Sequence, residues 1–161
     1  MMKNRLFFIG FGNMAEAIYQ RLDKKLFENV FLIEKSEDRR NLINKKNFTD
    51  TQILKQLGEI KFNSSDVLIL AVKPSQIDKA CKEIDPFIEE KQNIPIIISI
   101  AAGIKISSIR NNFSKFQKEI NVFRAMPNLC AKNGGSVTGL YGEFTNDKGS
   151  SSTNVISKIF S

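Results

Sequence analysis

The stretch that decides the fold is Leu6-Phe7-Phe8-Ile9-Gly10-Phe11-Gly12-Asn13-Met14-Ala15, close to the N-terminus. Its first four residues form an apolar run that glycine ends, which is typical of a buried strand. Apolar residues then recur at helical spacing through residues 13–26, so a helix is predicted to follow directly. The small residues between the two fit the pattern GxGxxA. A strand, a glycine turn and a helix in this order are typical of a dinucleotide site.

Each small residue of the turn has a physical role in such a site. Gly10 allows the tight turn, Gly12 lets a pyrophosphate approach the backbone, and Ala15 lets the helix pack close to the strand. The N-terminus of the helix offers free N–H groups and a partial positive charge to the phosphates. The alternative is a glycine turn that binds no ligand, and the position of this turn between a strand and a helix favours the dinucleotide.

Beyond the turn, strands and helices are predicted to alternate. The runs at 67–72 and 96–100 are apolar on both faces, as in parallel sheets that helices cover on both sides. The order predicts an α/β fold of the doubly wound Rossmann type with a mostly parallel sheet. Further strands are expected at 30–33, 121–125 and, antiparallel or at an edge, 136–141; helices are expected at 36–46, 50–57, 74–87, 105–113 and 151–160.

Composition narrows the chemistry. The 161 residues contain no histidine, which excludes Ser-His-Asp and Cys-His nucleophile systems within this chain. Two cysteines, Cys81 and Cys130, make neither a disulfide framework nor a zinc site, so no metal is expected. The net charge is +7 without a run of five basic residues, and we expect no nucleic-acid partner. No apolar run approaches the roughly 18–20 residues of a membrane span, and no signal peptide is visible, so we expect a cytoplasmic protein without a membrane partner.

The end of the second strand bears on which dinucleotide binds. Glu34 stands 22 residues after Gly12, near the usual acidic position about 20 residues on. A carboxylate there accepts a hydrogen bond from the ribose 2′-OH and repels a 2′-phosphate, which favours NAD(H). Lys35, Ser36 and Arg39 follow, and they would hold a 2′-phosphate if Glu34 turned away. Both NADP(H) and NAD(H) therefore stay open.

Three later strand ends meet the same edge of the sheet, where ligands of such folds bind. They carry small or polar residues: Ala71, Val72, Lys73 and Pro74; Ile100, Ala101 and Ala102; Met126, Pro127 and Asn128. Lys73 would either bond a cofactor hydroxyl or point to solvent. Asn128 would either face the ligand or form an Asx turn.

These segments together resemble the cofactor domain of pyrroline-5-carboxylate reductase. The segments that carry the resemblance are 8–18, 66–74, 98–104 and 124–128, within residues 5–136. The resemblance implies reduction of 1-pyrroline-5-carboxylate to L-proline with NADPH or NADH, the last step of proline biosynthesis. A cyclic iminium carbon already accepts hydride, so no covalent nucleophile is needed.

The resemblance also implies roles for residues. Ser36 would lie at the adenosine ribose, and Met126, Pro127 and Asn128 would lie near the nicotinamide. The pyrophosphate would contact the turn residues Ile9, Gly10, Phe11, Gly12, Asn13 and Met14. Two later strand ends would line the cleft, with the residues Ala71, Val72, Lys73, Pro74, Ile100, Ala101 and Ala102.

The sequence departs from the family in places. Leu129-Cys130 follow Asn128 where the family usually has Thr-Pro, and Gly58 stands where an adenosine-side Asn is common. The family continues with a helical domain that carries dimerisation and much of the substrate pocket. We expect residues 1–150 to be the cofactor domain and 151–161 to begin the connection to that domain, which is absent from this chain. Without it, we expect an exposed apolar patch formed by Val155, Ile156, Ile159 and Phe160.

Two alternatives remain at this stage. One is another NAD(P)- or deazaflavin-linked oxidoreductase of the β-hydroxyacid dehydrogenase-like group, against which the segment Arg124-Ala125-Met126-Pro127-Asn128 argues. The other is a non-catalytic nucleotide-binding module. The family resemblance also implies a homo-oligomer, which would form through the helical domain.

Overall fold

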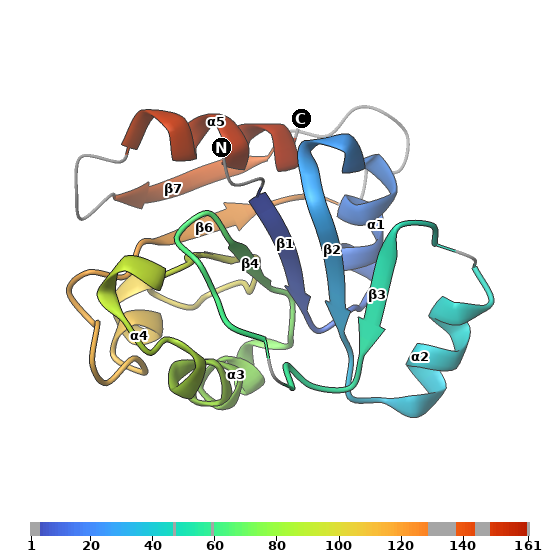
Figure 1. Cartoon of the computed structure of the whole chain (residues 1–161), viewed down its shortest axis with the longest axis horizontal. Coiled ribbons are helices and arrows are strands. Elements are labelled where there is room, and N and C mark those ends of the chain that lie inside the picture. The colour runs from blue at the N-terminus through green and yellow to red at the C-terminus, as the bar shows by residue number, and fades with distance from the viewer. Residues whose placement is uncertain (1–3, 47, 59, 129–137, 144–148, 161) are drawn as a thin grey trace.

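The computed structural model describes residues 4–46, 48–58, 60–128, 138–143 and 149–160. They form a seven-stranded sheet in the order β3-β2-β1-β4-β5-β6-β7 (Figure 1). The first six strands along the chain are parallel, and β7 is antiparallel to β6. The strands are β1 (Asn4–Ile9), β2 (Phe27–Ile33), β3 (Thr51–Leu54), β4 (Val67–Leu70), β5 (Ile96–Ser99), β6 (Val122–Met126) and β7 (Gly139–Glu143). The predicted Rossmann-type α/β fold is confirmed.

Helices cover both faces of the sheet. Buried residues of α1, α2 and α5 belong to the apolar cluster on one face, and those of α3 and α4 belong to the cluster on the other. The side chains of β1 alternate between the two clusters, with Phe8 on the first face and Phe7 on the second. The helices are α1 (Asn13–Arg21), α2 (Glu37–Asn44), α3 (Ile77–Ile84), α4 (Ile106–Arg110) and α5 (Gly149–Ile159); short 3-10 helices lie at Lys24–Leu26, Pro74–Gln76, Asp85–Phe87 and Lys91–Asn93.

The predicted helix at 50–57 is wrong, because part of that segment is β3. Thr51–Leu54 pairs in parallel with β2, from Val30 opposite Thr51 to Ile33 opposite Leu54. Ile53 packs on one face of the sheet and Leu54 on the other, which is the alternation of a strand. The Tyr19 hydroxyl is 2.6 Å from the Thr51 hydroxyl, and this hydrogen bond ties the strand to α1.

Several predicted helix boundaries also shift. The first helix ends at Arg21 rather than near residue 26, because Leu22 is extended and the Asp23 side chain accepts from the Lys25 N–H to begin a 3-10 turn. The α-helical part of the segment 74–87 is Ile77–Ile84, with 3-10 turns at both ends. The helix predicted at 105–113 shortens to Ile106–Arg110. The last strand, predicted at 136–141, begins at Gly139 in the structure. Residues 136 and 137 lie outside the described part of the chain.

The expected apolar patch on the last helix is wrong. Ile156 and Ile159 are buried in the cluster that α1 shares, and Val155 and Phe160 pack against it half-buried. The last helix therefore closes one face of the sheet instead of presenting an apolar surface.

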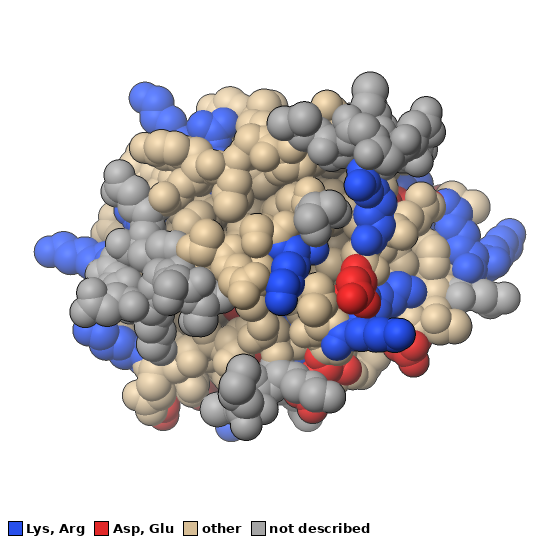
Figure 2. All heavy atoms as spheres, turned by 90° about the horizontal axis from the view of Figure 1, so that it is seen from above, with Lys and Arg blue, Asp and Glu red and all other residues tan. Residues whose placement is uncertain are grey.

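On the face seen in Figure 2, several Lys and Arg side chains lie close together on the right, with Asp and Glu side chains among them. Among the described residues, no helix combines the length and the apolar character needed to cross a bilayer.

Candidate functional site

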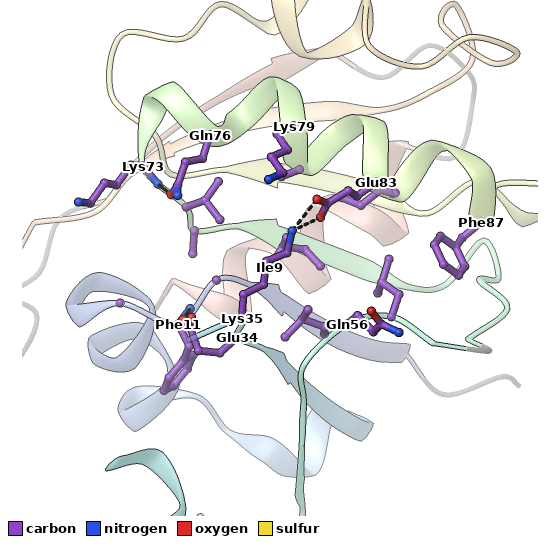
Figure 3. Close-up of a pocket in the computed structure, with 18 of the residues that line it drawn as sticks. Ile9, Phe11, Glu34, Lys35, Gln56, Lys73, Gln76, Lys79, Glu83 and Phe87 are labelled. Carbon is purple, nitrogen blue, oxygen red and sulfur yellow. Dashed lines mark hydrogen bonds and ion pairs between the residues drawn. The ribbon is translucent and has the colours of Figure 1, made fainter. Parts of the chain in front are cut away.

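A cavity of about 680 Å³ lies at the carboxyl ends of β1, β2 and β4, between the glycine turn and α3 (Figure 3). Its walls come from segments far apart in the sequence. Nine of the residues predicted for the site line it: Ile9, Gly10, Phe11, Gly12, Glu34, Lys35, Ala71, Val72 and Lys73. The cavity lies at the carboxyl ends of the strands, where the fold predicts a ligand.

Gly10 is required by two features of the turn. Its φ is +84°, a conformation that side chains disfavour. A Cβ placed there would lie 2.7 Å from Cγ1 of Val72 and 3.1 Å from the carbonyl oxygen of Ala71. The Gly10 N–H donates to the Ile33 carbonyl at 2.8 Å, so the turn is fixed between two neighbouring strands.

Gly12 differs from Gly10 because the space beside it is open. It caps the N-terminus of α1 with an ordinary negative φ of −81°, and a Cβ there would meet nothing within 4 Å. The structure itself therefore does not need a glycine at this position. A group that approaches the exposed backbone at the start of α1 does need one, as the phosphate role predicts.

Phe11 anchors the turn through its ring and through both of its backbone groups. The ring packs at 5.7 Å from Phe8 and 5.6 Å from Tyr19, between ring centroids, on the α1 face of the sheet. Its N–H donates to Oε2 of Glu34 at 3.0 Å, and its carbonyl accepts from Nε of Arg39 at 2.9 Å. The segment between β2 and α2 thus holds the glycine turn in place.

The Glu34 carboxylate lies at the end of β2, as the sequence predicts, with both oxygens engaged. Oε2 accepts from Phe11, and Oε1 accepts from the Ser36 N–H at 2.9 Å. These two hydrogen bonds hold the Glu34 carboxylate beside the glycine turn. Ser36 itself caps α2, because its hydroxyl accepts from the Arg39 N–H at 3.3 Å.

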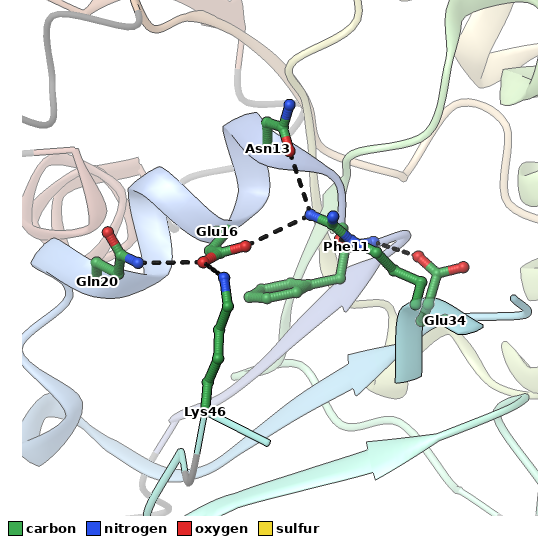
Figure 4. Close-up of polar contacts among 7 residues, drawn as sticks. Phe11, Asn13, Glu16, Gln20, Glu34 and Lys46 are labelled. Atoms are coloured by element: carbon green, nitrogen blue, oxygen red, sulfur yellow. Dashed lines mark hydrogen bonds and ion pairs between the residues drawn. The ribbon is translucent and has the colours of Figure 1, made fainter. Parts of the chain in front are cut away.

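The basic residues after Glu34 point to different partners. Arg39 also reaches Oδ1 of Asn13 at 3.3 Å and Oε2 of Glu16 at 3.4 Å, and Lys46 pairs with the same Glu16 carboxylate (Figure 4). Arg40 donates to the carbonyl oxygens of Glu34 and Lys35, at 2.8 Å and 2.6 Å. Neither arginine lines the cavity.

Lys35 does line the cavity and pairs across it. Its Nζ lies 2.5 Å from both carboxylate oxygens of Glu83, which belongs to α3. The sequence did not predict that α3 contributes a wall. This wall and the segment after β3 supply further lining residues: Gln56, Leu57, Gly58, Gln76, Lys79, Ala80, Glu83, Ile84 and Phe87.

The other predicted site residues lie outside the lining of this cavity. Asn13 and Met14 begin α1, and Pro74 begins a 3-10 turn after the exposed Lys73. Ala101 is buried, with its N–H donating to the Ser99 hydroxyl at 3.3 Å, and it follows β5 together with Ile100 and Ala102. Met126 ends β6 with 52% of its surface exposed, and Pro127 and Asn128 follow it. Leu129 and Cys130 lie outside the described residues.

Cys81, the free cysteine of the described residues, is buried and is not suited to act as a nucleophile. Burial raises the pKa of the Cys81 thiol to about 12, with a smaller contribution from the charge of Asp78, so the thiol is neutral at ordinary pH. Across the same ranges, no cluster of three or more His, Cys, Asp or Glu side chains is placed to hold a metal ion. The arrangement is suited to holding a ligand rather than to attacking one.

Comparison with known proteins matches this chain to a family of oxidoreductases and to pyrroline-5-carboxylate reductases. Residues 5–103 match the family model described as NADP oxidoreductase coenzyme F420-dependent. The chain is 34% identical over 146 residues to pyrroline-5-carboxylate reductase of Staphylococcus haemolyticus, covering 84% of this chain and 48% of the relative. It is 31% identical over 134 residues to the pyrroline-5-carboxylate reductase of Aquifex aeolicus, covering 83% of this chain and 46% of the relative. A solved pyrroline-5-carboxylate reductase from Coxiella burnetii superimposes with a TM-score of 0.79 at 28% identity, covering 99% of this chain and 56% of that one.

The similarities confirm the resemblance that the sequence motifs predicted. The family description names NADP, which confirms the prediction of a nicotinamide dinucleotide, NADP(H) or NAD(H), as the cofactor. The chain spans about half the length of the curated relatives it matches.

Proposed function

Because this chain belongs to the family described as NADP oxidoreductase coenzyme F420-dependent, and because it is similar to pyrroline-5-carboxylate reductases, we propose that it forms the cofactor-binding part of an enzyme that reduces 1-pyrroline-5-carboxylate to L-proline. The observation that carries the proposal is the cavity beside the glycine turn. There Gly10 is sterically required, whereas Gly12 leaves open space through which a phosphate can approach the backbone. The residues present therefore fit a dinucleotide.

We assign the residues as follows. Residues 9–14 hold the pyrophosphate, because the first N–H groups of α1 are free to donate there. Glu34 faces the adenosine ribose together with Lys35 and Ser36. Residues 71–73 line the cavity, and we assign residues 74 and 100–102 to the cleft beyond it, toward the nicotinamide. Met126, Pro127 and Asn128 lie near the nicotinamide, at the end of β6.

The chemistry is positioning rather than covalent catalysis. The bound dinucleotide supplies the hydride. The chain's own residues hold it at the strand ends, so that one face of the nicotinamide is presented to the substrate ring. A cyclic iminium acid is the proposed substrate, and its electrophilic carbon would accept the hydride directly.

We further propose that residues 1–150 form the cofactor domain together with α5, which packs on its sheet, and that the end of α5 leads toward the part of the relatives that this chain does not span. Homo-oligomer formation and most of the substrate pocket would belong to that part. The 161-residue chain alone is therefore expected to bind cofactor and to turn over 1-pyrroline-5-carboxylate slowly.

A thermal-shift titration with NADH and NADPH tests the proposal. A ligand at 100 times its Kd stabilises the folded state by about 2.7 kcal/mol, which corresponds to a rise of roughly 5–11 °C in the melting temperature for a chain of this size. We expect NADH to bind more tightly than NADPH, because the Glu34 carboxylate repels a 2′-phosphate.

Gly12→Asp is the matched control. A Cβ at position 12 would meet no atom within 4 Å, so the unliganded variant is expected to melt like the wild type. The added carboxylate occupies the phosphate approach, so the shift with either cofactor should disappear. A wild-type chain that responds to neither cofactor, or a variant that responds as strongly as the wild type, would overturn the proposal.

A further inference from the structure

An ion pair spans the cavity at the end of β2. Lys35 extends from the strand end and Glu83 from α3, 48 residues later, and Nζ lies 2.5 Å from both carboxylate oxygens (Figure 3). Both residues line the cavity. Their side chains are 57% and 44% exposed, so the pair is open to solvent and able to exchange partners.

Lys35 is set apart from its basic neighbours by this position. Arg39 is engaged with the Phe11 carbonyl and the Glu16 carboxylate, and Arg40 is engaged with two backbone carbonyls. Of the basic residues between 34 and 40, Lys35 is the one that lines the cavity beside Glu34. A 2′-phosphate at the ribose would therefore meet Lys35 as its nearest cation from this segment.

The charges around Lys35 oppose that contact. Glu34 is held beside the glycine turn by the Phe11 and Ser36 amides, and Glu83 holds the Lys35 ammonium. Two carboxylates thus flank the Lys35 ammonium. A 2′-phosphate would have to displace Glu83 from Lys35 and then lie close to both carboxylates, whereas a 2′-hydroxyl needs no cation.

We propose that Glu83 is a second determinant of cofactor selectivity, which disfavours NADPH by occupying Lys35. The inference rests on the proposed dinucleotide site. Lys79 precedes Glu83 by one helical turn on α3 and lines the same cavity, which puts a replacement cation within reach of Glu83. Displacement of Glu83 from Lys35 by a 2′-phosphate is therefore only weakly opposed, and Glu83 sets the ratio of the NADH and NADPH affinities.

The test is the dissociation constants of NADH and NADPH, measured by nicotinamide fluorescence for the wild type, Glu83→Gln and Glu89→Gln. Glu89 is exposed and outside the cavity lining, so its variant changes the net charge equally without touching the site. Because an exposed ion pair is weak, we expect Glu83→Gln to tighten NADPH binding by about two- to fivefold, with NADH binding changed by less than about twofold and Glu89→Gln without effect on either.

A third variant tests the route through Lys35. Adding Lys35→Met to Glu83→Gln should abolish the gain in NADPH affinity, because the freed ammonium is then gone. The inference is overturned if Glu83→Gln leaves the ratio of the two affinities as in the wild type, or if the gain survives without Lys35. A wild-type chain that binds neither cofactor would instead overturn the proposed function itself, and the inference with it.

Discussion

Replacing Asp66 by alanine should lower the stability of the fold substantially while leaving the cofactor cavity intact. Asp66 is fully buried at the start of β4, at the opposite end of the strand from the cavity. Its Oδ1 accepts from Nε of Arg5 at 2.9 Å, and its Oδ2 accepts from Nη2 of Arg5 at 2.6 Å and from the Asn63 N–H at 2.8 Å. The carboxylate thus joins β1, β4 and the loop before β4.

The magnitude follows from what the substitution leaves behind. Breaking a buried ion pair by removing one partner destabilises a protein by about 3–5 kcal/mol. The Arg5 side chain is 21% exposed and keeps its bond to the Lys61 carbonyl at 2.7 Å, so water can partly solvate it. We therefore expect the lower end, about 3 kcal/mol. For a chain of this size, that is a fall of roughly 6–12 °C in the melting temperature.

The assay is urea unfolding followed by circular dichroism, with Asp66→Asn and Glu89→Ala beside Asp66→Ala. Asp66→Asn keeps an acceptor for the Asn63 N–H and should lose less, whereas Glu89→Ala removes an exposed carboxylate and should change stability by less than about 0.5 kcal/mol. A loss for Asp66→Ala no larger than that of the surface control would refute the reasoning. The hydrogen bond to the Asp66 carboxylate also raises the pKa of Arg5, so the guanidinium stays charged throughout the working pH range.

Two other positions give sharp expectations. Gly10→Ala should destabilise the chain by about 2–4 kcal/mol, since the new Cβ combines a positive φ with a 2.7 Å approach to Val72; an unchanged melting curve would contradict this, and Gly12→Ala should melt normally. Cys81 in a Cys130→Ser background should react with a thiol reagent at pH 8 only as fast as the protein unfolds, and rapid labelling of the native protein would count against the assigned burial. Because folding raises the pKa of the Cys81 thiol from 9.0 to about 12, its contribution to stability is complete below pH 9 and is lost as the pH rises from 9 toward 12.

The parts of the fold that the sequence predicted well are those with a strong local signal. The runs at the centres of β4 and β5 are apolar on both faces, and Ser36 has the residue type and position of a helix cap. The segment Thr51–Leu54 carries no such signal, because four residues with two polar side chains fit either period. Its strand conformation is set by pairing with β2, which is a long-range effect.

The residues of the site also differ in how well the local sequence predicts them. The glycine turn and Glu34 follow from spacing along the chain, and the structure brings them together at one cavity. The wall from α3 was missed, because which face of a crossover helix meets the cavity depends on its packing against the sheet. Its one local signal was the apolar spacing of Ile77, Ala80 and Ile84, which identifies a buried face but not a ligand.

The contacts of Phe11 also bear on how cofactor choice changes during evolution or engineering. Glu34 is the obvious residue to replace when a preference for NADPH is wanted, yet its carboxylate also accepts the backbone N–H of the glycine turn. A neutral apolar residue there would remove a repulsive charge and at the same time loosen the turn that holds the phosphates. Glu83 contacts no backbone of the turn and sits in an exposed pair. Single-step routes toward the other cofactor should therefore begin on α3, and changes at position 34 should succeed only after another group has taken over the Phe11 amide.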